Sequence, residues 1–121
     1  MAQEQLEVQT QEIDSTVRLI TLKGPLTIGT MFNFQSDLRK ESTHSLVIDL
    51  SGVEYMDSAG LGCLLGGMAS CQRSGRGFAL AGVSERVLMV FTVTGVENLV
   101  PRYPDAASAI AAVKAKAAGA K

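Results

Sequence analysis

The sequence predicts an α/β fold in which a mixed, partly parallel sheet of four to five strands carries about four helices. Short β-branched apolar runs alternate along the chain with segments whose apolar residues recur every three or four positions. The run 45–50 is apolar almost throughout, which is typical of a strand buried on both faces of a sheet. Strands that alternate with helices are joined by right-handed crossovers, so the helices should pack on the sheet.

Four segments have the apolar patterns of strands. Residues 5–12 alternate weakly, which suits an edge strand, whereas residues 45–50 should be central. The breaker Gly24-Pro25 follows one strand, and Gly75-Arg76-Gly77 precedes another. The predicted strands are 5–12, 17–22, 45–50 and 78–83.

Four further segments have apolar residues at helical spacing. Ser84 is a good N-cap for a helix that Gly95 would end, although the apolar run between them fits a strand on periodicity alone. Pro101 and Pro104 enclose a loop before the last helix. The predicted helices are 29–41, 59–73, 84–94 and 105–117.

Length and composition indicate one domain over residues 1–121, with a core at about 6–113 and a helix end and frayed tail at 114–121. The 11 basic and 12 acidic side chains are spread along the chain, so we expect no nucleic-acid partner. The N-terminus lacks the pattern of an export signal, and the apolar runs fall short of the roughly 20 residues of a membrane span. We therefore expect a soluble, cytoplasmic protein without membrane insertion.

Few residues are candidates for catalysis or metal binding. Cys63 and Cys71 lie about 12 Å apart along one predicted helix, too far for a disulfide. His44 is the only histidine, and we expect it in a solvent-facing loop. Two cysteines and one histidine are fewer ligands than a structural zinc site needs. The sequence predicts no catalytic residue, cofactor or metal, and a protein that is not an enzyme.

The most informative segment is 57–62, which joins the central strand to the next helix at the edge where sites of open α/β sheets gather. Either Asp57 or Ser58 could cap that helix. A phosphate on Ser58 would gain from the first-turn amides and would add negative charge to any docking surface. We therefore predict a phosphorylation switch at Ser58. The glycines from Gly60 onward lack the third glycine of a dinucleotide fingerprint, so a nucleotide-binding module is the minor alternative.

These residues resemble the STAS domain family, specifically its stand-alone bacterial anti-sigma factor antagonists. The runs 46–53, 57–62 and 84–101 carry the resemblance, which covers about residues 6–113. It implies a mixed sheet with four helices and a partner switch. In that switch the unphosphorylated protein binds an anti-sigma factor that is also a serine kinase, and so frees the sigma factor. Phosphorylation at the position matching Ser58 ends the binding, and a phosphatase restores it.

Two places depart from the family pattern. Thr27 stands where an acidic side chain often neighbours the phosphorylation site, although its hydroxyl could still hydrogen-bond there. Leu88 and Met89 replace residues that are commonly charged, so we expect a homodimer or an additional partner contact there. A non-phosphorylated subunit of a signalling scaffold or of a membrane transporter complex is the alternative function. The predicted partner surface comprises Thr27, Asp57, Ser58, Ala59, Gly60, Leu61 and Gly62.

Overall fold

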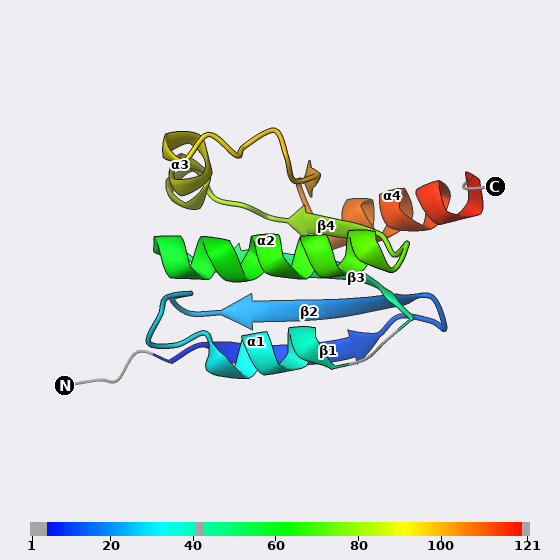
Figure 1. Cartoon of the computed structure of the whole chain (residues 1–121), viewed down its shortest axis with the longest axis horizontal. Helices are drawn as coiled ribbons and strands as arrows, with labels where there is room; N and C mark the ends of the chain where they lie inside the picture. Colours follow the sequence, from blue (N-terminus) through cyan, green and yellow to red (C-terminus); the bar gives the residue numbers. More distant parts are fainter. Residues whose placement is uncertain (1–4, 41–42, 120–121) are drawn as a thin grey trace.

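Five strands and four helices form the chain in a computed structural model that describes residues 5–40 and 43–119 (Figure 1). This arrangement confirms the mixed sheet and the four helices that the sequence predicts. In chain order the elements are β1 (Glu7–Glu12), β2 (Val17–Lys23), α1 (Phe32–Arg39), β3 (Ser45–Gly52), α2 (Ser58–Arg73), β4 (Phe78–Ala81), α3 (Glu85–Val93), β5 (Arg102–Tyr103) and α4 (Ala106–Gly119).

The strands lie in the sheet in sequence order, with β1 antiparallel to β2 and the remaining neighbours parallel. The apolar run of β3 is buried between β2 and β4, which confirms the central position predicted for residues 45–50. Because β2, β3 and β4 are parallel, their carboxyl ends meet at one edge of the sheet. The chain segment with Ser58 follows β3 directly and therefore lies at that edge.

Helices cover both faces of the sheet (Figure 1). On one face α1, α2 and α3 bury side chains such as Phe34, Leu64 and Phe91 in the larger core. On the opposite face α4 packs alone and forms a smaller core. The buried members of that smaller core are Val17, Val47, Ala79, Ala81, Ala109 and Val113.

Several element boundaries differ from the sequence prediction, and two of the differences have a clear physical reason. Helix α1 begins at Phe32 rather than at residue 29, because the amides of Thr30 and Met31 both donate to the Thr27 carbonyl and form a turn first. The predicted end of this helix at residue 41 lies outside the described residues. Strand β4 ends at Ala81 because Gly82 adopts φ 68, a left-handed conformation that breaks the strand.

Strand β5 lies where the sequence predicts a loop between two prolines. It has two residues, which is too short for any periodicity, and it pairs in parallel with Leu80 and Ala81 of β4. The Leu80 amide donates to the Pro101 carbonyl at 2.9 Å, so the strand begins beside a proline that cannot itself donate.

The prediction of a solvent-facing His44 is wrong. Its side chain is 15% exposed, and Nε2 lies 3.8 Å from Oε2 of Glu12. The turn between β1 and β2 is held against the start of β3 by a hydrogen bond from the Ser45 amide to the Thr16 carbonyl, 2.8 Å long. His44 precedes Ser45, so it lies beside the hairpin rather than in solvent.

Cys63 and Cys71 are both buried and unpaired, as the helical spacing predicts. Burial raises the pKa of both thiols, so the reactive thiolate form is disfavoured at neutral pH. Their role in α2 is to fill the core.

Candidate functional site

Two loops run side by side at the carboxyl edge of the parallel strands. One follows β2 and the other follows β3, and Leu26 forms a parallel bridge with Met56 between them. The Leu26 amide donates to the Tyr55 carbonyl at 3.0 Å, and the Asp57 amide donates to the Leu26 carbonyl at 3.3 Å. Because the side chains of Leu26 and Met56 are buried, the core holds both loops in place.

Asp57, not Ser58, is the N-cap of α2. Its Oδ1 accepts from the Gly60 amide at 2.9 Å, and its Oδ2 accepts from the Ile28 amide in the neighbouring loop at 3.1 Å. Partial burial opposes ionisation, but these backbone hydrogen bonds outweigh it and lower the pKa of Asp57 below its ordinary value. The carboxylate therefore stays ionised at neutral pH and joins the helix to the loop after β2.

Gly60 allows the two segments to approach. A Cβ added at Gly60 would overlap the carbonyl oxygen of Leu26, whereas one added at Gly62 would meet nothing within 4 Å. Gly67, farther along α2, packs against the Leu38 side chain of α1. The close backbone contact made by α2 is thus at Gly60.

Ser58 is the first residue of α2 and is exposed. Within the part of the chain that the structure describes, its hydroxyl has no hydrogen-bond partner. The hydroxyl of Thr27 is engaged inside its own loop, where it accepts from the Gly29 amide at 3.2 Å and lies 3.3 Å from the Thr30 hydroxyl oxygen. Thr27 therefore supports the loop rather than hydrogen-bonding to Ser58.

The remaining residues of the predicted surface differ in exposure. Gly62 is exposed and Ala59 is partly buried, while Gly60 and Leu61 are buried. The buried pair can position a surface but offers a partner little to touch. Sequence reasoning missed two exposed apolar residues that flank Asp57, namely Ile28 at 59% and Tyr55 at 54% exposure. Their positions in loops beside Asp57 were the available signal.

A shallow depression of about 360 Å³ separates the start of α2 from α3. Its lining from α3 is mainly apolar, and Met89 and Val93 are 64% and 80% exposed. Leu88, in contrast, is partly buried against the core, so only Met89 of the predicted pair is presented to a partner. The depression is lined by Met56, Asp57, Ser58, Arg86, Met89, Val90, Val93 and Thr94.

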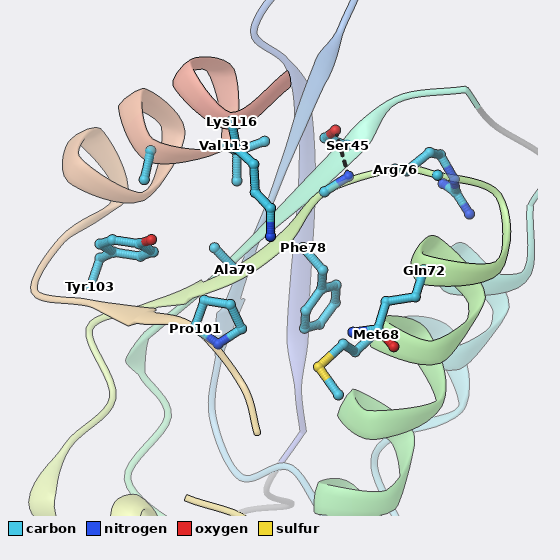
Figure 2. A pocket seen from close by; sticks show the side chains of 13 residues that line it. Ser45, Met68, Gln72, Arg76, Phe78, Ala79, Pro101, Tyr103, Val113 and Lys116 are labelled. Atoms are coloured by element: carbon cyan, nitrogen blue, oxygen red, sulfur yellow. Dashed lines mark hydrogen bonds between the residues drawn. The ribbon is translucent and has the colours of Figure 1, made fainter. Parts of the chain in front are cut away.

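A second cavity, of about 220 Å³, lies at the opposite, amino edge of the strands. Figure 2 shows Lys116 of α4 reaching toward Phe78 and Pro101, with the Gly77 amide donating to Ser45 Oγ at 2.9 Å nearby. Arg76 at its rim is held by its own contacts, since it donates to Ser74 Oγ and to the His44 carbonyl.

Residues 5–40 and 43–119 contain no cluster of three or more His, Cys, Asp or Glu side chains that could hold a metal ion. None of their helices combines the length and apolar character needed to cross a membrane.

The STAS domain model matches residues 7–109, and the chain belongs to that family. It is 37% identical over 62 residues to the anti-sigma-B factor antagonist of Staphylococcus epidermidis, a match that covers 51% of this chain and 57% of that relative. The matched part thus spans little more than half the length of the relative.

Two solved structures show the same fold at 19% identity. The phosphorylated form of the Bacillus cell fate determinant SpoIIAA superposes with a TM-score of 0.70, covering 88% of this chain and 99% of that one. A sulfate transporter family protein from Wolinella succinogenes gives a TM-score of 0.72, covering 89% and 93%. Since an antagonist and a transporter family protein share the fold, the fold alone does not assign the function.

The close approach at Gly60 predicts opposite effects for two glycine substitutions in α2. Gly60→Ala should destabilise the protein by about 1 to 3 kcal/mol, because the new methyl group must displace the Leu26 backbone. The control Gly62→Ala should stabilise it by up to about 1 kcal/mol through helix propensity alone. Urea unfolding of both variants measures the difference, and equal effects would contradict the packing at Gly60.

The double role of Asp57 predicts an effect on a second element in addition to the loss of a helix cap. Asp57→Ala should cost at least the roughly 0.5 to 2 kcal/mol of a lost cap. The control is Asp105→Ala, which should cost about 0.5 to 2 kcal/mol, because among the described residues its carboxylate accepts from Ser108 in α4 alone. Hydrogen exchange at the Ile28 amide should accelerate in Asp57→Ala alone. The loss of folding free energy in Asp57→Ala should become smaller as the pH falls below about 4. Because the pKa of Asp57 is lowered in the folded protein, its ionised carboxylate stabilises the fold, and protonation removes that contribution from the wild type. Unchanged exchange at Ile28 would contradict the bridge.

Proposed function

We propose that this chain is an anti-sigma factor antagonist that works by partner switching in the bacterial cytoplasm. In this proposal the unphosphorylated protein binds an anti-sigma factor that is also a serine kinase, and the sigma factor is released. The observation that carries the proposal is the exposed Ser58 hydroxyl, free for modification beside an Asp57 that already caps the helix. The name of the Staphylococcus epidermidis relative supports it.

Ser58 is the proposed phosphate acceptor. Its Oγ would attack the γ-phosphorus of ATP held by the kinase, the bond to the β–γ bridging oxygen would break, and ADP would leave. The hydroxyl proton passes to a base of the kinase, so this chain acts as a substrate and not as an enzyme. A phosphatase would hydrolyse the ester and restore the serine. The phosphorylated form of SpoIIAA, which shares the fold, supports a modification of this kind.

The surface around Ser58 suits such a switch. Ile28, Tyr55 and Met89 offer exposed apolar area, which favours a protein partner. A phosphoserine would add about −1.5 to −2 charges beside the ionised Asp57, at a surface that the partner must desolvate. Charge repulsion and the cost of desolvation would then both oppose binding.

A second candidate is a non-phosphorylated STAS subunit of a signalling scaffold or of a membrane transporter complex. The fold shared with the Wolinella succinogenes transporter family protein favours it, as does Thr27, which brings no charge to the site. In that function Ser58 would be a surface residue without modification. The two candidates therefore differ in whether a kinase acts on Ser58.

Incubation with ATP and the kinase encoded nearest to this gene should add one phosphate, located on Ser58 by peptide mapping. Ser58→Ala should gain none, while the control Ser51→Ala, another exposed serine at the same edge of the sheet, should be modified normally. Ser58→Ala should change stability by less than about 0.5 kcal/mol, because the cap is Asp57. An unmodified wild type, with the kinase active on another protein, would favour the second candidate.

A fixed charge at the site should mimic the modification in part. Ser58→Asp should weaken binding to the anti-sigma factor about tenfold or more, whereas Ser58→Ala should bind as the wild type does. Isothermal titration calorimetry with the isolated anti-sigma factor measures both. Wild-type affinity for Ser58→Asp would refute a switch based on charge.

The apolar side chains of α3 should contribute to the same contact. Met89→Glu should weaken binding of the anti-sigma factor, because Met89 lines the depression next to Ser58. Leu99→Glu is the control, since Leu99 is similarly exposed, at 59%, but lies outside the depression. Sedimentation of the free protein tests the predicted homodimer, which Met89→Glu should disperse. Equal affinity of Met89→Glu and Leu99→Glu for the anti-sigma factor would exclude α3 from the partner surface.

A further inference from the structure

Arg86 is a cation without an evident role in the fold. It lies in the first turn of α3 and is exposed, and it lines the depression together with Ser58. Its guanidinium group makes no ion pair or hydrogen bond with any residue that the structure describes. A positive charge in the first turn of a helix also gains nothing from the helix dipole. Arg86 is therefore available to a group added to the lining of the depression.

A phosphate on Ser58 would need such a cation. The Gly60 and Leu61 amides, which a phosphate at the start of α2 could otherwise use, already donate to the side chain and the carbonyl of Asp57. The Asp57 carboxylate next to Ser58 would repel the phosphate. The first turn of α2 thus offers a phosphate less than the sequence alone indicates.

The charged groups that face Ser58 are few. Among the residues that line the depression, Asp57 carries the negative charge and Arg86 the positive one. The loop after β2 comes closest to Asp57 through Ile28, and Thr27 next to it is neutral. Among the described residues, Arg86 is accordingly the one basic side chain that lines the depression.

We propose that Arg86 binds the phosphate carried by Ser58, which closes the depression between α2 and α3. This inference rests on the proposed phosphorylation of Ser58. The guanidinium group presents paired N–H donors that fit two phosphate oxygens at once. Met89 and Val93 line the same depression, so the contact would change the apolar surface that the unphosphorylated form offers to its partner. Phosphorylation then acts on α3 as well as on the start of α2.

The test uses the full chain with phosphoserine inserted at position 58 during translation, so that no kinase is needed. A phosphorus NMR titration gives the second pKa of the phosphate, which is about 6 for an unperturbed phosphoserine. In Arg86→Gln this pKa should rise by about 0.5 to 1 unit relative to the wild type, because a neighbouring cation favours the dianion. The difference between the two phosphate pKa values should shrink in 1 M salt, where the Debye length is only about 3 Å.

Arg73→Gln is the matched control. Arg73 is an exposed arginine in the last turn of α2, the helix that Ser58 begins, so its replacement should leave the phosphate pKa unchanged. Arg86→Lys should retain most of the wild-type value, because it keeps the charge and loses only the paired donors. Circular dichroism establishes that each variant is folded.

Equal phosphate pKa values in the wild type and in folded Arg86→Gln would overturn the proposal. So would an equal rise in Arg73→Gln, which would show a general effect of net charge. Since the phosphoserine is encoded, a kinase that fails to modify Ser58 would count against the proposed function and leave this measurement intact. Conversely, normal phosphorylation without a pKa difference would remove only the contact with Arg86.

Discussion

The carboxylate of Asp57 is the interaction on which the functional edge of this protein depends. Its two oxygens accept from amides in two different elements, Gly60 in α2 and Ile28 in the loop after β2. A serine in this position would provide one acceptor atom, and an asparagine would turn an amino group toward one of the two amides. A carboxylate is the side chain that caps the helix and holds the loop at once. The absence of a Cβ at Gly60 lets the loop come close enough.

The role of Ser58 follows from the two hydrogen bonds that Asp57 accepts. Because Asp57 caps α2, the exposed hydroxyl of Ser58 is not needed as the helix cap. A group added to that hydroxyl changes the charge and shape of the surface while the hydrogen bonds that hold the edge together stay intact. The proposed switch therefore changes which partner is bound without requiring the sheet or α2 to unfold. Only side chains near the depression, such as Arg86 and Met89, need to adjust.

Much of this architecture could be predicted from the chain itself. The continuous apolar run of β3 and the spacing of leucines in α2 gave the central strand, the following helix and the edge where Ser58 lies. Features that depend on contacts distant in sequence could not be predicted in this way. The pairing of Ile28 with Asp57 joins residues that are 29 positions apart. Strand β5 exists only because β4 offers it hydrogen-bond partners, and two residues leave no pattern.

The candidate site shows the same division. The sequence motif indicated Ser58 as the site of modification but left both Asp57 and Ser58 as possible helix caps. The pairing of the two loops places the Ile28 amide beside Asp57, and the structure has Asp57 as the cap. The apolar sequence of α3 indicated an interface without showing which side faces solvent. Packing of Val87 and Phe91 in the core turns Met89 and Val93 outward, and Leu88 stays partly covered. The proximity of Arg86 to Ser58 depends on the placement of two helices that the chain joins only through β4.

The solitary helix α4 gives the molecule two cores separated by the sheet. Substitutions at Ala109 or Val113 would alter the free energy of unfolding, and with it the abundance of the protein in a cell, far from the surface around Ser58. Effects at distant sites that share no contacts add almost independently. Evolution could therefore tune the amount of this protein through one side of the sheet and its choice of partner through the other.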